Sequence, residues 1–467
     1  MTHSITLLHG VGTREDLPLP FALVVTGAAV VLIITFVGVL RLWRSPRWER
    51  SQGLPLPRLT RVVDHPAVLW AGRGLAMAVA AVGQIALWFG TDQVRNPFPG
   101  LLFVWVWVGL VPCSLLLGAV WRRLSPIRVL LAWRGALGAE GPLPRWGVWP
   151  GVLGLLGFGF LELVQPDRTH LDVLRVWFVA WLVWVVVPTL VWGSRWIASA
   201  DPFEVYATAV SRISPWQRID GVIHLVNPLR QLSSVSVPRG TWAVGGVLIG
   251  ITAFDSLGTS SAWVQAAQNS TLPRALWGTV GLLVLVALAL GLYALGASRL
   301  AAASRDSVPS VVPGPVSGPP VSGPPVPGSP VPDPHVSGRT VMDEGLLNRL
   351  GVSLVPIAVG YTIAHYATYL VLEGQRVAVN LSDPLSRGQD WFGTATLGVD
   401  ARIFEHPSLM AWNQVLGIVV GHVVAVLVAH DLAIRWLPPR RQVSGQIPLL
   451  AVMVVFTCGG LLLLFQA

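Results

Sequence analysis

Long apolar stretches recur along the whole chain, and they constrain its fold more than any other feature. About 20 consecutive apolar residues suffice to cross the hydrocarbon core of a bilayer as an α-helix, and a span in lipid must satisfy its backbone hydrogen bonds internally. The chain is 53% hydrophobic and only 12% charged. We therefore predict an all-α, polytopic membrane protein. The ten predicted spans cover residues 21–40, 74–89, 101–120, 146–163, 173–192, 241–254, 276–300, 352–372, 413–437 and 447–465.

The distribution of basic residues predicts how the spans are oriented. All 32 basic residues are arginine, and the net charge is +9. Eight arginines precede the first span or follow an even-numbered one: Arg14, Arg95, Arg168, Arg175, Arg274, Arg376, Arg387 and Arg402. The other 24 lie in the turns after odd-numbered spans, which therefore face the cytoplasm with both termini outside. We predict a multi-pass protein of the cell membrane whose arginines contact anionic lipid and bind no nucleic acid.

A proline-rich segment divides the predicted spans into two groups. Residues 307–337 repeat short Val-Ser-Gly-Pro-Pro units, a composition typical of an extended tether. We predict an N-terminal seven-span bundle over 1–300, a cytoplasmic linker over 301–345 and a C-terminal three-span bundle over 346–467. Within the first bundle, apolar residues at helical spacing predict an interfacial helix near 201–218.

The eighth span carries polar side chains at a helical interval. Tyr361, His365 and Tyr369 recur every fourth residue, and Glu373 follows at the end of the span. Residues at this interval lie on one side of a helix, and ionisable groups inside a membrane are costly and usually functional. The two tyrosines are candidate substrate-binding residues, although packing within the bundle is the simpler role for them.

Four residues in all are candidate metal ligands. Together with His365, His422 in the ninth span, Asp255 at the end of the sixth and Glu162 at the end of the fourth are predicted to line one outward-facing cavity. Imidazole and carboxylate ligands suit zinc or another divalent ion. No HxH, HExxH or CxxC spacing is present, so a hydrogen-bonded neutral His365, an interfacial Glu162 and a helix-ending Asp255 remain alternatives.

Several segments resemble an actinobacterial family of integral membrane proteins that carries the name fenitrothion hydrolase. The matching segments are His9-Gly10-Val11-Gly12, residues 16–20, residues 108–117, Leu161-Glu162-Leu163-Val164, residues 203–215, Phe254-Asp255, residues 354–366, Glu373-Gly374-Gln375, residues 382–394, Gly421-His422 and Ala429-His430-Asp431. The resemblance covers most spans but not the proline-rich segment. It implies hydrolysis of an aryl phosphotriester, in which water displaces a nitrophenol at phosphorus.

Three functions follow from these features. The first is metal-assisted hydrolysis of a lipophilic ester in an outward-facing pocket, with Glu373 or Asp383 as general base and Asp390 beside the substrate. The second is a carrier or permease that uses the polar ridge to bind substrate or relay protons. The third is a noncatalytic membrane scaffold. The sequence identifies membrane lipids as partners and is compatible with a small lipophilic substrate, and protein partners are unknown.

Overall fold

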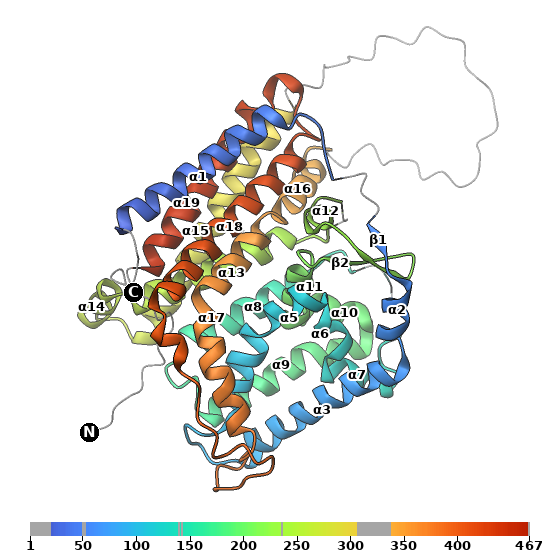
Figure 1. The fold of residues 1–467 in the computed structure, drawn as a ribbon, viewed down its shortest axis with the longest axis vertical. Helices are drawn as coiled ribbons and strands as arrows, with labels where there is room; N and C mark the ends of the chain where they lie inside the picture. The colour runs from blue at the N-terminus through green and yellow to red at the C-terminus, as the bar shows by residue number, and fades with distance from the viewer. Residues whose placement is uncertain are drawn as a thin grey trace, which may run out of the picture.

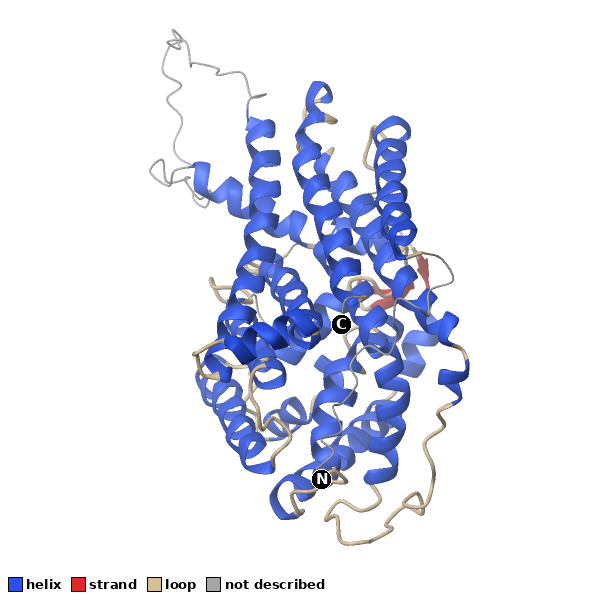
Figure 2. Ribbon diagram, turned by 90° about the vertical axis from the view of Figure 1, so that its left-hand side faces the viewer, coloured by secondary structure: helices blue, strands red, loops and turns tan. Residues whose placement is uncertain are grey.

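The computed structural model describes residues 20–48, 53–138, 141, 143–234, 237–305 and 338–465, which are mostly helical (Figure 2). The segment around His9 and the proline-rich repeat lie outside these ranges. Helix α15 extends to Arg305 and α16 begins at Gly338, so helical residues occupy both ends of the predicted linker over 301–345. Apolar helix formers continue past Leu300, which explains the longer helix.

Nine of the ten predicted spans are confirmed as helical segments long and apolar enough to cross a membrane, counting only the part of the chain that the structure describes. The helices of these segments are α1 (Phe21–Leu42), α3 (Pro66–Phe89), α4 (Pro97–Gly100) with η2 (Leu101–Val108) and α5 (Leu110–Leu117), α9 (Leu171–Trp192), α13 (Thr241–Thr259), α15 (Arg274–Arg305), α16 (Gly338–Gly351) with α17 (Leu354–Asn380), α18 (Pro407–Ala433) and α19 (Ile447–Leu464). The predicted span over 146–163 is the apolar helix α8 (Trp149–Leu163), which has only 15 residues. At 1.5 Å per residue it is about 22 Å long, which is shorter than the hydrocarbon core.

Shorter elements connect these helices. They are α2 (Pro57–Val63), α6 (Val120–Leu124), α7 (Pro126–Trp133), α10 (Ser194–Ala200), α11 (Pro202–Ser211), α12 (Pro228–Ser234), α14 (Ser261–Asn269), η3 (Arg402–Glu405), η4 (Pro439–Arg441), η5 (Ser444–Gln446), β1 (Leu54–Pro55), β2 (Trp216–Ile219) and β3 (Val222–Leu225).

A small antiparallel sheet, absent from the all-α prediction, lies at one end of the bundle. Its strand order is β1-β3-β2, so it joins the segment after α1 to the segment after α11. Asp220 and Gly221 connect β2 to β3 with φ angles of 49° and 81°, and positive φ at both positions suits a two-residue hairpin turn. We call the end of the bundle that carries α2, α12 and this sheet the sheet end.

The opposite end is formed by α14 and by the loops over 90–96, 164–170 and 381–406, and we call it the loop end. Figure 1 shows α14 on the side opposite to α2, α12 and the strands. The loops are tied together because the Thr91 backbone N–H donates to the Leu385 carbonyl at 3.2 Å. His170 Nδ1 also lies 3.5 Å from Asp92 Oδ2. Loops far apart in the sequence therefore form one surface.

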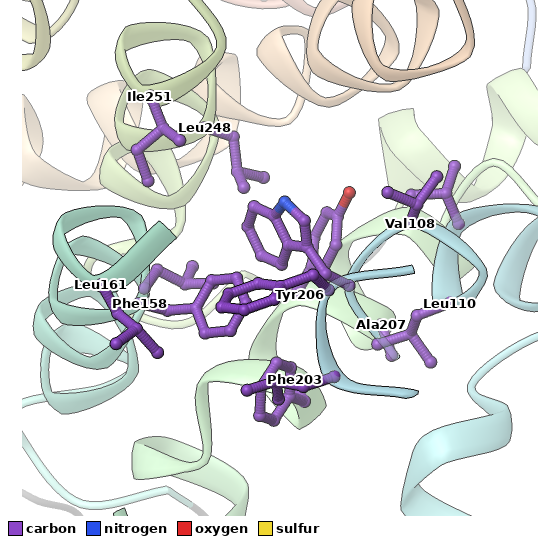
Figure 3. Packing of buried hydrophobic residues seen from close by; sticks show 14 of the residues in the cluster. Val108, Leu110, Phe158, Leu161, Phe203, Tyr206, Ala207, Leu248 and Ile251 are labelled. Carbon is purple, nitrogen blue, oxygen red and sulfur yellow. The ribbon is translucent and has the colours of Figure 1, made fainter. Parts of the chain in front are cut away.

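Helix α11, which corresponds to the predicted interfacial helix, is buried instead of half exposed. It begins where the Asp201 carboxylate accepts a hydrogen bond from the Phe203 N–H at 3.2 Å. Phe203 and Tyr206 are 1% and 3% exposed. Figure 3 shows α11 among α8, α13 and the segment around Val108, with Leu110, Phe158, Leu161, Phe203, Tyr206, Ala207, Leu248 and Ile251 in the same cluster. Apolar residues of α11 do recur at helical spacing, but neighbouring helices cover the polar face of α11 as well.

The two predicted bundles share one core. Leu32 of α1 and Tyr293 of α15 belong to the same buried cluster as Val428 of α18 and Leu449 of α19. A second cluster joins Phe158 of α8 to Tyr366 of α17. The described parts of the N-terminal and C-terminal segments therefore pack as one helical body.

Candidate functional site

Polar side chains on α17 form the centre of the candidate site. Tyr361, His365, Tyr366 and Tyr369 are 6%, 2%, 1% and 9% exposed, so all four are buried. We call them, together with Ser256, Asp255 and Glu162 from neighbouring helices, the polar ladder. The ladder follows one side of α17 because Tyr361, His365 and Tyr369 are each four positions apart, and Tyr366 is three positions from Tyr369.

Asp255 on α13 connects two members of the ladder. The Tyr366 hydroxyl donates to Asp255 Oδ2 at 2.6 Å, and His365 Nε2 lies 2.8 Å from the same oxygen. The side chains of His365 and Asp255 are only 1% and 4% exposed. A carboxylate, an imidazole and a phenol thus meet inside the protein: the phenol is hydrogen-bonded to the carboxylate, and the imidazole lies within ion-pair distance of it.

A second contact extends the ladder along α17. The Ser256 and Tyr361 hydroxyls lie 2.5 Å apart in a buried hydrogen bond, in which either oxygen can donate. The Tyr361 and His365 rings are stacked with their centroids 6.0 Å apart. Helices α13 and α17 approach closely because Gly245 has no side chain, and a Cβ there would lie 2.5 Å from Leu354 Cβ. Ser256 follows Gly245 by three helical turns and therefore faces α17 as well.

Glu162 brings a second carboxyl group to the same region. It is 3% exposed, near the end of α8. Its Oε2 atom is buried without a hydrogen-bond partner among the described residues. The Glu162 carboxylate interacts electrostatically with Asp255. It also interacts electrostatically with the Tyr369 hydroxyl. The ladder therefore holds two carboxyl groups within electrostatic range of each other.

A pocket of about 350 Å³ opens beside the ladder at the loop end. Phe254, Trp263 and Trp277 line it together with Arg168, Arg274 and Asp255. The aromatic wall is continuous, because the Trp263 ring lies 5.5 Å from Phe254 and 5.2 Å from Trp277 between centroids. Helix α14 carries Trp263 and is started by Ser260, whose hydroxyl accepts a hydrogen bond from the Trp263 N–H at 3.3 Å. Asp255 belongs both to this pocket and to the ladder.

The predicted ligands are not gathered into one metal-binding set. Asp255 contacts His365 and lies within electrostatic range of Glu162. His422 instead uses Nδ1 to contact the Ile418 carbonyl of its own helix at 2.8 Å. In the described ranges, no three or more His, Cys, Asp or Glu side chains are placed to hold a metal ion.

The other predicted site residues have local partners. Glu373 forms an ion pair of 2.8 Å with Arg376, one turn along α17. Asp383 accepts hydrogen bonds from the Arg387 and Gly388 backbone at 2.9 and 2.7 Å. These contacts stabilise the end of α17 and the start of the following loop.

Asp390 has a similar structural environment. It accepts hydrogen bonds from the Ser382 hydroxyl and, at 3.0 Å, from the Ala395 backbone N–H. These donors hold the pKa of the Asp390 carboxyl below its usual range. Both hydrogen-bond partners belong to the same loop as Asp390, so the geometry favours a role in loop structure.

Tyr366 and Ser256 belong to the site, although the i, i+4 pattern did not include them. Tyr366 lies between His365 and Tyr369 in the sequence and is three residues from Tyr369, so the helical periodicity contained the signal. Ser256 gave a weaker signal, because only its contact with Tyr361 distinguishes it from other hydroxyl side chains in helices.

The fold and the ladder define a polytopic membrane protein with a buried polar site next to a pocket at one end of the bundle. No family model, curated protein or solved structure matches the chain. The geometry of the site is therefore the basis for inferring a function.

Proposed function

We propose that the protein is a carrier that binds a small aromatic anion in the loop-end pocket and couples this binding to proton movement along the polar ladder. One observation carries the proposal: Asp255 lines the pocket and also contacts His365 and Tyr366. Protonation of Asp255 is thereby linked both to the pocket and to the buried interior. Carriers commonly place such groups inside the membrane.

The lining of the pocket supports an aromatic anion as the solute. Phe254, Trp263 and Trp277 offer rings for stacking. Arg168 and Arg274 offer positive charge on the same lining. An anion that enters this pocket also favours a proton on Asp255, because the two negative charges repel each other. Solute binding and proton uptake are thereby coupled.

The ladder supplies a route for the proton into the bundle. From Asp255 it passes along the hydrogen bond to Tyr366 or to the imidazole of His365. The hydrogen-bonded hydroxyls of Tyr361 and Ser256 are the next groups of the ladder, and a water molecule has to bridge the gap to them. Burying the carboxyl groups of Asp255 and Glu162 in one site costs less free energy when one of them keeps its proton. The positive-inside rule places the arginine-rich sheet end in the cytoplasm and the loop end outside. The solute then enters from outside the cell membrane.

Proton flux into sealed vesicles tests the proposal. Full-length protein is reconstituted around a trapped pH dye, and benzoate or 4-nitrophenolate is added outside. We expect solute-dependent acidification, and the substitutions Asp255→Asn and His365→Gln should each slow it by about tenfold or more. His422→Gln is the matched histidine control and should retain the wild-type rate. Equal rates in all four proteins would refute the proposal.

A second candidate, ester hydrolysis, is favoured by the aromatic wall beside Asp255 and by the resemblance to the family named fenitrothion hydrolase. In that reaction Asp255 takes a proton from water, the water oxygen attacks phosphorus, and the aryl oxide leaves and is protonated by solvent. A zinc site needs three or four protein ligands, and the described residues do not provide such a set. No metal therefore enters this proposal.

Hydrolysis and transport are separated by assays in detergent, where no sealed compartment exists. A hydrolase releases 4-nitrophenol from a dialkyl 4-nitrophenyl phosphate under these conditions, and Asp255→Asn abolishes the release. A carrier releases none. Elemental analysis of the purified protein, wild type beside His365→Gln and His422→Gln, tests the metal directly: bound zinc that both substitutions remove would restore the metal-assisted reaction.

A further inference from the structure

A second cavity, separate from the polar ladder, lies at the sheet end. It has a volume of about 240 Å³. Arg122 of α6, Arg195 of α10 and Arg212 at the end of α11 all line it. Three guanidinium groups from three different elements thus share one cavity.

The carboxylate that lines this cavity is already matched by another arginine. Glu204 accepts two hydrogen bonds from Arg128, with nitrogen–oxygen distances of 2.5 and 2.6 Å. A second arginine, Arg122, has its Nε atom 4.0 Å from Glu204 Oε1. The charge of Glu204 is therefore shared by Arg128 and Arg122 and does not balance the other arginines of the cavity.

Arg212 is the group that points most directly to a ligand. Its Nη1 atom is buried and has no hydrogen-bond partner among the described residues. A buried guanidinium nitrogen without an acceptor is costly. Arg195 lines the same cavity and remains exposed, and within the described ranges no carboxylate forms an ion pair with either side chain. An anion placed between them would remove this cost.

The remaining lining combines apolar residues, among them Val148, Val205 and Val244, with the hydroxyl side chains of Ser194, Thr208 and Thr241. A cavity with guanidinium groups and an apolar wall suits an anion that also carries hydrocarbon. Basic pockets between helices on the cytoplasmic side of membrane proteins bind phosphate headgroups, and the planar guanidinium matches two phosphate oxygens.

We propose that the sheet-end cavity binds a phosphate group, with Arg212 and Arg195 as its donors. The phosphate belongs either to the headgroup of an anionic phospholipid or to a free phosphate compound. In both cases Arg212 donates from the buried side and Arg195 from the exposed side. The site is independent of the loop-end pocket and of the solute bound there.

Binding to the full-length protein in a neutral detergent tests the proposal. The two probes are phosphatidylglycerol, added as mixed micelles against a phosphatidylcholine background, and inorganic phosphate, each followed by the shift in melting temperature with concentration. We expect saturable stabilisation by at least one probe, with an affinity lowered about tenfold or more by Arg212→Gln. Arg440→Gln, an exposed arginine elsewhere at the sheet end, should keep the wild-type affinity.

The two probes identify the source of the phosphate. Stabilisation by phosphatidylglycerol alone supports a lipid headgroup, and stabilisation by inorganic phosphate as well supports a free anion. If Arg212→Gln does not fold, Arg195→Gln serves instead, because its side chain is exposed and its replacement should not disturb packing. The proposal is overturned if neither probe stabilises the wild type, or if the Arg195 variant binds both probes as tightly as the Arg440 variant.

Discussion

Glu204 and Arg128 show how a charged residue is retained inside this bundle. Their side chains are 2% and 7% exposed, and the guanidinium engages both carboxylate oxygens. Removing one partner of a buried pair leaves the other charge without compensation, which costs more than the pair itself contributes. The arrangement therefore depends on both residues.

We expect Glu204→Gln to lower the free energy of unfolding by about 3–5 kcal/mol, because Arg128 then lies buried without a counter-charge. Thermal unfolding of the purified protein measures the loss. Glu405→Gln is the matched control, since Glu405 is exposed, and a change within about 0.5 kcal/mol is expected there. Equal melting temperatures for the two variants would contradict the role of the pair.

At the level of single residues, the sequence predicted the ladder only in part. Tyr361, His365 and Tyr369 follow from helical spacing, and all three side chains are buried. Spacing within α17 cannot identify Asp255 as the partner of His365, because the two residues belong to helices whose packing depends on side-chain shape. The same limit applies to His422, whose partners outside α18 cannot be identified from spacing within one helix.

At the level of elements, close packing of α17 and α18 depends on glycine. A Cβ on Gly421 would lie 2.6 Å from the Pro356 carbonyl oxygen, and a Cβ on Gly360 would overlap the Gly417 carbonyl oxygen. Small residues allow helices in membranes to approach closely. This crossing lies one residue before Tyr361, so it fixes the part of α17 that carries the ladder.

We expect Gly360→Ala to destabilise the protein by about 1–3 kcal/mol, because the added methyl group forces the helices apart. It should also slow the proposed proton flux, since Tyr361 moves with the backbone. Thermal unfolding and the vesicle assay measure the two effects. Gly459→Ala in α19 is the control, because a Cβ there has no heavy atom within 4 Å. An unchanged melting temperature for Gly360→Ala would show that the crossing is not tightly packed.

Another element departs from the expectation of a regular span. The stretch predicted over 101–120 contains the π-helical segment η2, followed by Gly109 and α5. The wider turn places Trp107 against Tyr206 of α11, with ring centroids 5.0 Å apart. Apolar composition predicted that this stretch crosses the membrane, but hydrogen-bond register within the helix is decided by packing against α11 and α17.

For the whole molecule, the orientation in the membrane is the property with the most direct test. In a protein whose Cys113 and Cys458 are replaced by serine, single cysteines are introduced at Thr396 in the loop end and at Val443 in the sheet end, both exposed. We expect a membrane-impermeant maleimide to label Thr396→Cys in intact cells and Val443→Cys only after permeabilisation. Permeabilised cells are the control, because both cysteines should react there. The reverse pattern would place the arginine-rich end outside.

The sequence by itself determined the class of this protein and the positions of most membrane-crossing helices. The length of an apolar segment is a local property, and so is the need to pair its backbone groups inside lipid. Together they leave a chain of this composition few folds other than a bundle of membrane helices. The tertiary structure decided that the two predicted bundles share one core, that α11 is buried and that Asp255 meets His365 beside a pocket. These features depend on which helix faces pack together, and that choice is made by contacts between distant parts of the chain that no local pattern contains.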